Sequence, residues 1–172
     1  DVDAFPLDGN EWLDSDNDGV GDNSDAYPDD ATRSSLEFSE ALNLVVDDAL
    51  RQCIENNASG NGRRDVASDI TNVSCGWNNI QTLEGLEHFT GVEYLELRGN
   101  NFTDLTPVLA LKRLEQLLLG HTNAQVDYEV VGELVGLKRL SLSHINNETS
   151  IGDAPWLSSL ARLTYLELSY SG

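Results

Sequence analysis

Apolar residues recur along the second half of the chain in a fixed order: apolar, two residues, apolar, one residue, apolar. The order occurs five times from residue 70 onward, and its first positions step by 22, 22, 23 and 26 residues. Such a period is typical of a solenoid, in which each repeat buries its apolar side chains only against the neighbouring coils. The apolar positions are Ile70, Val73 and Cys75; Val92, Leu95 and Leu97; Leu114, Leu117 and Leu119; Leu137, Leu140 and Leu142; and Leu163, Leu166 and Leu168.

This spacing is that of a leucine-rich repeat, and residues 95–111, LELRGNNFTDLTPVLAL, resemble the 22-residue repeat of internalin-type proteins. The resemblance covers about residues 36–172. It implies an α/β solenoid of about five coils, in which one short strand per coil joins a parallel sheet on the concave side. The family positions present here are Asn100, Phe102, Leu105 and Pro107. In later copies Thr122, Ile145 and Ser171 replace the asparagine, which interrupts the ladder that satisfies turn backbone groups.

An amphipathic helix is predicted over residues 34–57, immediately before the first repeat. Ser34 and Glu37 have the spacing of a capping box at its start, and a turn-forming cluster over 56–62 ends it. An end coil of a solenoid exposes its apolar side chains unless something covers it, so we expect this helix to cap the first coil. The predicted apolar stripe consists of Phe38, Ala41, Leu42, Val45, Val46, Ala49, Leu50, Cys53 and Ile54.

The two cysteines are Cys53, in the predicted helix, and Cys75, at an inward position of the first strand. A disulfide between them would join the cap to the solenoid and would suit an oxidising, extracellular environment. The alternative is two buried thiols in a reducing compartment.

Residues 14–25, DSDNDGVGDNSD, hold five aspartates and no lysine or arginine. Their spacing is that of a twelve-residue calcium loop, with oxygen ligands at positions 1, 3, 5, 7, 9 and 12 and a glycine at position 6 for the sharp turn. A bound Ca²⁺ would supply the counter-charge that lets the loop fold. The alternative is a solvated acidic linker. The predicted ligands are Asp14, Asp16, Asp18, the carbonyl oxygen of Val20, Asp22 and Asp25.

The sequence around this loop repeats after 22 residues. The residues DAFP at 3–6 recur as DAYP at 25–28, so Asp3 matches the last ligand of a preceding loop. Position 12 is aspartate and no amphipathic helix precedes the loop, so a helix–loop–helix hand is not expected. Residues 1–30 instead resemble the thrombospondin type-3 calcium repeat in its bacterial surface-protein form, which wraps around Ca²⁺ ions and has little other core. Weaker ligand candidates under that resemblance are Asp8, Asp29 and Asp30.

The chain has 30 acidic and 10 basic residues and a net charge of −20, which argues against nucleic acid as a partner. No apolar run approaches the roughly 20 residues of a membrane span, so no membrane insertion is predicted. We expect three parts: a calcium repeat over 1–33, a helical cap over 34–69, and leucine-rich repeats over 70–172. Because the sequence starts inside a motif and stops after a strand, we expect a piece of a longer protein.

The candidate ligand surface is the concave sheet, which receives the residues beside and between the last two apolar positions of each repeat. Aromatic, arginine and small polar residues mix there, as is typical of protein interfaces, and the mixture also suits sugar stacking. The alternative is an ordinary solvated sheet. The candidate residues are Tyr94, Arg98, Leu118, Arg139 and Tyr165.

No catalytic constellation is present in the sequence, and an enzyme is not expected. The three histidines are His88, His121 and His144, and none pairs with a cysteine or glutamate at metal spacing. Two functional hypotheses follow. The first is a secreted or surface-displayed, adhesin-like module that binds a protein or a glycan through the concave face. The second is a structural spacer or filament unit whose partner is another copy of the same chain.

Overall fold

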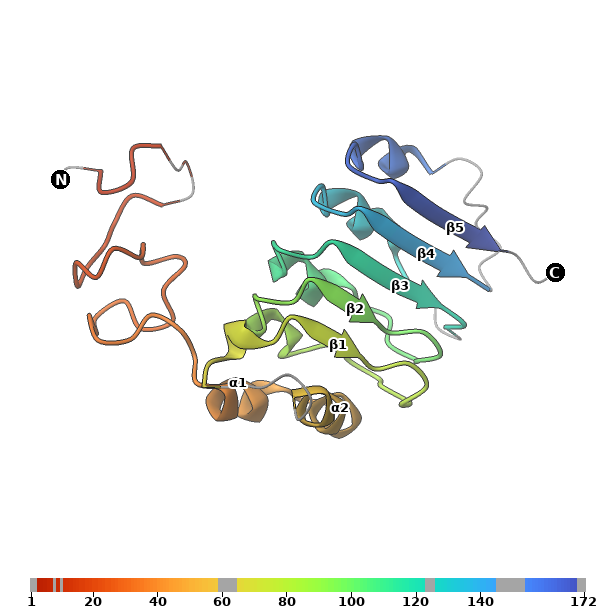
Figure 1. Ribbon diagram of the computed structural model, residues 1–172, viewed down its shortest axis with the longest axis horizontal. Coiled ribbons are helices and arrows are strands. Elements are labelled where there is room, and N and C mark those ends of the chain that lie inside the picture. Colours follow the sequence, from red (N-terminus) through yellow and green to blue (C-terminus); the bar gives the residue numbers. More distant parts are fainter. Residues whose placement is uncertain are drawn as a thin grey trace. The chain divides into compact units, whose positions relative to one another are not determined.

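The computed structural model of the chain describes residues 3–7, 9, 11–58, 65–122, 126–144 and 154–169 (Figure 1). Contacts between residues divide the chain into two compact units, Asp1–Glu37 and Phe38–Gly172. Each unit is described by itself. Three residues named from the sequence, Asp8, Ile145 and Ser171, lie outside the described residues.

The second unit is a leucine-rich repeat solenoid, as the apolar spacing predicts. Its sheet has five parallel strands in the order β1-β2-β3-β4-β5, each paired with the strand of the next coil (Figure 1). The register places equivalent repeat positions side by side, so Val73 faces Leu95, and Leu95 faces Leu117. The strands are β1 (Asn72–Ser74), β2 (Tyr94–Glu96), β3 (Gln116–Gly120), β4 (Arg139–Ser143) and β5 (Tyr165–Ser169).

A short 3₁₀ segment precedes each strand and leads the chain into the coil of that strand. Pro107 and Pro155 lie at the start of two of these segments, where a proline removes no needed backbone donor. The segments described are η1 (Ala67–Asp69), η2 (Leu86–His88), η3 (Thr106–Ala110), η4 (Tyr128–Glu133) and η6 (Pro155–Ser159).

The core lies between the sheet and these segments. In the first four coils, the apolar positions predicted to point inward are all at most 2% exposed. The fifth coil differs, because Leu166 is 40% and Leu168 is 43% exposed. Among the described strands β5 pairs only with β4, so its leucines are covered from one side.

Asn100 holds the turns of the first two coils together. Its side chain is fully buried, donates to the carbonyl oxygens of Cys75 (2.8 Å) and Leu97 (2.9 Å), and accepts from the backbone N–H of Ile80 (3.0 Å). At the equivalent place in the third coil, Thr122 is 2% exposed and its hydroxyl lies 3.1 Å from that of Tyr128. A pair of hydroxyl groups therefore occupies the place that an asparagine side chain holds in the second coil.

The single helix predicted over residues 34–57 is wrong. The structure has two helices, α1 (Phe38–Leu44) and α2 (Asp48–Ala58). The break follows from Asp47, whose Oδ1 accepts from the backbone N–H groups of Ala49 and Leu50, both at 2.9 Å, and so starts α2 afresh. The sequence pattern could not show this, because apolar residues continue through the break; Val46 on the predicted stripe is 54% exposed.

Both helices cover the first coil, as expected of a cap (Figure 1). Buried Leu50 and Ile54 of α2 belong to the solenoid core. The backbone N–H of Val46 donates to Glu84 O at 3.1 Å, and Gly85, at φ 96°, lies so close to the Val45 backbone that a side chain would collide with it. The cap is thus fixed by backbone contacts as well as by apolar burial.

The first unit contains no helix or strand in its described residues. Its 22-residue repeat recurs as local geometry: Asp3 Oδ1 accepts from Phe5 N–H at 2.8 Å, and Asp25 Oδ1 accepts from Tyr27 N–H at 2.7 Å. Both are aspartate turns of the same kind. Each copy also has an equivalent hydrogen bond between residues farther apart in sequence: Ala4 N–H donates to Trp12 O, and Ala26 N–H donates to Ser34 O.

Candidate functional site

The acidic loop brings three of its predicted ligands together. Carboxylate oxygens of Asp14, Asp16 and Asp18 all lie within 4.8 Å of one another. The loop turns back on itself through Gly19, which has φ 96°, a conformation that favours glycine. Asp14 accepts from the backbone N–H of Asn17 at 2.7 Å and of Gly19 at 3.1 Å, which orients its carboxylate.

Two buried carboxylate oxygens in this loop have no hydrogen-bond partner among the described residues, Asp16 Oδ2 and Asp25 Oδ2. Asp25 is only 9% exposed. Partial burial and the neighbouring charges of Asp18, Asp25 and Asp14 raise the pKa of Asp16, against a hydrogen bond from Asp18 N–H that lowers it. Buried, unpaired carboxylate oxygens are costly, and a hard oxygen-liganded cation such as Ca²⁺ would satisfy them.

The remaining predicted ligands have local partners. Asp22 accepts from the backbone N–H (2.8 Å) and hydroxyl (2.7 Å) of Ser15. Asp30 accepts from the hydroxyl of Thr32 at 2.6 Å. This bond, together with a second one from the Thr32 backbone N–H, lowers the pKa of Asp30. Asp3 accepts a hydrogen bond from the backbone N–H of Phe5, which stabilises the turn at Asp3. Val20 is partly buried, and its N–H donates to Asp18 Oδ1 at 2.8 Å.

Sequence reasoning missed Glu11, which fixes the other side of the loop. Its carboxylate is 7% exposed and accepts from the backbone N–H of Asn23 at 3.1 Å and from the hydroxyl of Ser24. It also lies against Gly21, where any larger residue would collide with it. Glu11 precedes the twelve-residue spacing and has no acidic counterpart 22 residues later, so no motif pointed to it.

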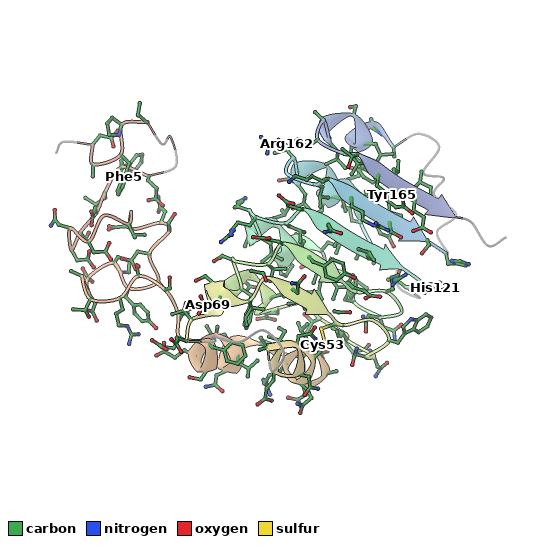
Figure 2. All side chains as sticks on the ribbon, viewed as in Figure 1. Phe5, Cys53, Asp69, His121, Arg162 and Tyr165 are labelled. Carbon is green, nitrogen blue, oxygen red and sulfur yellow. A yellow bond between two sulfur atoms is a disulfide. The ribbon has the colours of Figure 1, made fainter. Side chains whose placement is uncertain are left out.

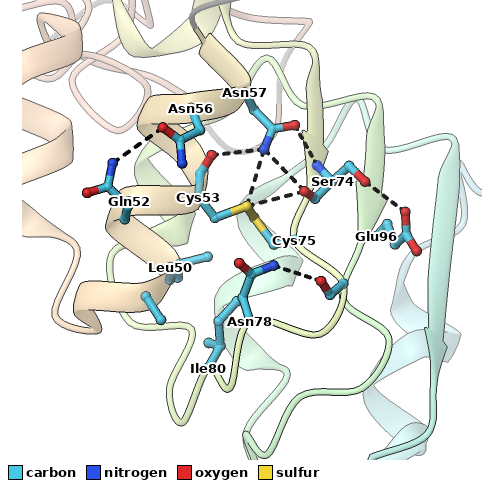
Figure 3. Close-up of a disulfide and its surroundings, with 12 residues drawn as sticks. Leu50, Gln52, Cys53, Asn56, Asn57, Ser74, Cys75, Asn78, Ile80 and Glu96 are labelled. Carbon is cyan, nitrogen blue, oxygen red and sulfur yellow. Dashed lines mark hydrogen bonds between the residues drawn. A yellow bond between two sulfur atoms is a disulfide. The ribbon is translucent and has the colours of Figure 1, made fainter.

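The predicted disulfide is present: Cys53 of α2 and Cys75, just after β1, are bonded, with 5.8 Å between their Cα atoms (Figure 3). Beside it, Asn57 satisfies the free edge of β1. Its Oδ1 accepts from Ser74 N–H at 3.0 Å, and its Nδ2 donates to Ser74 O at 3.2 Å and Cys53 O at 2.8 Å. The disulfide and this amide together join cap and sheet.

The concave face consists of three rows of side chains that run across the strands. The register places Tyr94, Gln116, Arg139 and Tyr165 in one row, and Glu96, Leu118, Ser141 and Glu167 in the next. The third row includes Gly120 and Ser143. Arg98, which follows the end of β2, lies beside them. Figure 2 shows Tyr165 on the last of these strands.

Polar groups on this face hold one another in place. Glu96 accepts from Ser74 Oγ at 2.7 Å and from Arg98 Nε at 2.9 Å. Burial alone would raise the pKa of Glu96, but the bonds from Ser74, Arg98 and Tyr94 outweigh it and lower the pKa. Burial and the charge of Glu96 raise the pKa of Tyr94. These side chains are therefore ordered without a ligand.

Arg139 of β4 and Tyr165 of β5 are two exposed residues of this face. The Arg139 guanidinium lies over the Tyr165 ring, 4.1 Å from its centroid, and Tyr165 is 42% exposed. Leu118 was expected to face a ligand, but it is only 8% exposed. The reason is its place on the central strand, between Glu96 and Ser141, where two strands on each side restrict solvent access. Little of Leu118 is left for a partner to contact.

No family model matches the chain, and no curated protein matches it. Solved structures do match its fold. An internalin from Listeria monocytogenes is 23% identical with a TM-score of 0.59, over 73% of this chain and 44% of that protein's. A leucine-rich repeat protein of Leptospira interrogans is 22% identical with a TM-score of 0.51, over 59% of this chain and 26% of its own.

The functional domain of a second Listeria monocytogenes internalin, described as including a cysteine ladder, is 19% identical with a TM-score of 0.52. The match covers 77% of this chain and 28% of that one. The chain thus spans less than half the length of each of these three proteins. At these identities the likeness establishes a leucine-rich repeat fold. In the described part of the chain, no helix is both long and apolar enough to cross a membrane.

Proposed function

We propose that the chain is a calcium-stabilised, extracellular binding module that takes a protein ligand on the concave face of its solenoid. Arg139 and Tyr165 carry this proposal, because they form an ordered and accessible pair. Other polar side chains of this sheet surface hydrogen-bond to one another. Tyrosine and arginine are enriched at the energetic centres of protein interfaces. Ordering them beforehand lowers the entropy lost when a partner binds.

Charge on this face also supports a protein ligand. The chain as a whole has a net charge of −20. On the concave face, the acidic Glu96 and Glu167 are matched by the basic Arg98 and Arg139. A nearly neutral patch on a strongly acidic molecule is a place where a partner can approach without the repulsion that the rest of the surface imposes.

Calcium is proposed for the acidic loop on the strength of the converging oxygens of Asp14, Asp16 and Asp18 and the unpartnered oxygens of Asp16 and Asp25. All are hard oxygen donors, which Ca²⁺ prefers. When bound, the ion would neutralise the repulsion among these carboxylates. Residues in and beside the loop orient the donors: Gly19 makes the turn, and Glu11 accepts a hydrogen bond from Asn23 on the other side of the loop.

The extracellular location is proposed from two features of different kinds. The Cys53–Cys75 disulfide suits an oxidising compartment. A calcium loop of modest affinity would be filled only where calcium is in the millimolar range, as outside cells. An adhesin-like role on a bacterial surface is the form of this proposal that the resemblance to internalins favours.

The proposal is tested by measuring binding of the chain to a panel of purified extracellular receptor and matrix proteins in millimolar calcium. Arg139→Ala and Tyr165→Ala should each weaken a genuine interaction at least tenfold, whereas Glu129→Ala, on the exposed side of η4, should not change it. Equal losses from all three variants would refute the concave site. Concentration-dependent self-association of the chain, measured by light scattering, would favour the structural alternative instead.

A further inference from the structure

A row of residues in left-handed backbone conformation runs along one edge of the sheet. Trp77, Gly99, His121 and His144 are the residues that follow the first four strands at equivalent positions, and their φ angles are 62°, 71°, 50° and 57°. For residues other than glycine this conformation is uncommon and costs about 1–2 kcal/mol. Tryptophan in this position therefore calls for an explanation beyond the turn itself.

Three aromatic rings in this row contact one another. His121 and His144 are stacked, with ring centroids 4.1 Å apart and an angle of 16° between the rings. Trp77 meets His121 at 5.2 Å and 45°, although a whole coil lies between them. Trp77 spans that coil because its indole lies on Gly99, where a side chain would collide with it. Figure 2 shows His121 at this edge of the sheet.

The outer face of Trp77 is open to solvent. The indole lies against Gly99 and meets the tilted ring of His121, yet the residue remains 69% exposed. A tryptophan left this exposed forgoes much of the free energy that burial of its large apolar surface would contribute. Its orientation is nonetheless fixed, because the backbone conformation, the bare Gly99 and the histidine stack each restrict it.

Exposed side-chain amides follow Trp77 in the chain. Asn78 and Asn79 follow Trp77 directly in the chain and are exposed. Asn79 Oδ1 accepts from Asn101 Nδ2 at 3.2 Å and from Gln81 Nε2 at 3.3 Å, which joins the amides of two successive coils. An amide carries two donors and two acceptor lone pairs, so this cluster keeps unused hydrogen-bonding capacity toward solvent.

We propose that Trp77 and these amides form a binding site for a neutral glycan, in which the apolar face of a pyranose ring stacks on the outer face of the indole. The amides of Asn78, Asn79 and Asn101 and the imidazole edge of His121 then exchange hydrogen bonds with the sugar hydroxyls. A flat apolar face beside groups that both donate and accept matches a sugar ring, which has an apolar C–H face and a rim of hydroxyls.

The charge of the molecule selects among glycans. At a net charge of −20, the chain repels sulfated and sialylated sugars, so a neutral hexose or N-acetylhexosamine is the expected ligand class. The site lies on the turns after the strands, whereas the proposed protein site uses Arg139 and Tyr165 within them. The two proposals are therefore independent and can fail separately.

The experiment probes an array of neutral oligosaccharides, with terminal glucose, galactose, mannose or N-acetylglucosamine, with the whole 172-residue chain in millimolar calcium. Binding to at least one of these classes is expected, and Trp77→Ala should weaken it at least tenfold. Trp77→Phe should retain part of the affinity, because a smaller ring face remains. Trp12→Ala is the matched control, since Trp12 is 71% exposed but lies in the first unit.

The glycan site would be overturned by a lack of any neutral sugar that retains the wild-type chain, or by a Trp12→Ala variant that weakens retention as much as Trp77→Ala does. Retention that depends on Arg139 and Tyr165 but not on Trp77 would overturn it too, while leaving a ligand on the concave face. Conversely, sugar binding that requires Trp77 and persists in Arg139→Ala supports this site whatever becomes of the protein ligand. Thermal unfolding of each variant checks that the solenoid remains folded.

Discussion

The side chain of Asn57 pairs with the backbone of Ser74 as a neighbouring strand would: Oδ1 accepts from Ser74 N–H at 3.0 Å, and Nδ2 donates to Ser74 O at 3.2 Å (Figure 3). β1 is the first strand of the sheet, and its outer edge would otherwise leave these groups unpaired. One amide at the end of α2 thus both satisfies the strand edge and fixes the cap on it.

Asn57→Ala should lower the free energy of unfolding by about 0.5–1.5 kcal/mol, because it removes the two hydrogen bonds that the side chain makes with the Ser74 backbone. The measurement is urea unfolding followed by circular dichroism. Gln52→Ala on the exposed side of the same helix is the matched control, and we expect it to change stability by less than about 0.5 kcal/mol. Equal stability of the Asn57 variant and the wild type would show that water replaces the amide at no cost.

The disulfide should contribute about 2–4 kcal/mol to the stability of the solenoid, since it closes a segment between residues 22 apart in sequence. The Cys53→Ala, Cys75→Ala double variant is the appropriate comparison, because both sulfur atoms are in the core and a serine hydroxyl would add a desolvation cost. Thiol titration of the denatured, unreduced wild type should find no free thiol. Two titratable thiols per chain would contradict the bond.

Acid should destabilise the solenoid through His121. Burial, together with the charges of His144 and Arg98, lowers the pKa of His121 below its ordinary value of 6.5. The unfolded chain therefore binds this proton at a higher pH than the folded chain does, so stability is full above about pH 6.5 and falls as the pH drops through the lowered folded pKa.

The matched variant for this prediction is His121→Asn, because asparagine tolerates the left-handed conformation and does not titrate. We expect wild type to lose stability relative to His121→Asn between about pH 6.5 and pH 5, before most carboxylates protonate. Unfolding free energies at several pH values test it. Two curves that run parallel through this window would show that the imidazole gains its proton equally in both states.

The solenoid could be predicted from sequence because its apolar spacing is dictated directly by burial. Val73, Leu95 and Leu117 meet in register since a parallel stack places equivalent positions side by side. The break between α1 and α2 could not be predicted, because Asp47 acts through Ala49 and Leu50 N–H groups while the apolar pattern runs on unchanged. Local capping there overrides a periodicity that spans both helices.

The candidate sites divide in the same way. The spacing of Asp14, Asp16 and Asp18 was enough to expect that their carboxylates converge, since alternate residues of a turning loop point to one side. The role of Glu11 depends on a contact across the loop that no motif encodes. Likewise the contact of Trp77 with His121 depends on the missing side chain of Gly99, a relationship between coils and not within one.

The calcium proposal makes a prediction about the acidic loop itself. Partial burial and the charges of Asp18, Asp25 and Asp14 raise the pKa of Asp16, so repulsion among these carboxylates opposes the folded loop when no cation is bound. Calcium removes that repulsion. In limited proteolysis at neutral pH, cleavage within residues 1–30 should accordingly be slow in calcium and fast in chelator; equal rates would show that the loop's order does not depend on the ion.

The most direct test of the account is calorimetric titration of the chain with calcium at neutral pH. We predict binding with a dissociation constant on the order of 10⁻⁴–10⁻³ M, and its loss in the Asp16→Asn, Asp18→Asn double variant. The control is Glu129→Gln with Glu133→Gln, which removes two exposed charges from the solenoid and should leave binding unchanged. Absence of binding heat in wild type, or equal calcium affinity in the aspartate variant, would contradict the calcium-stabilised module proposed for this chain.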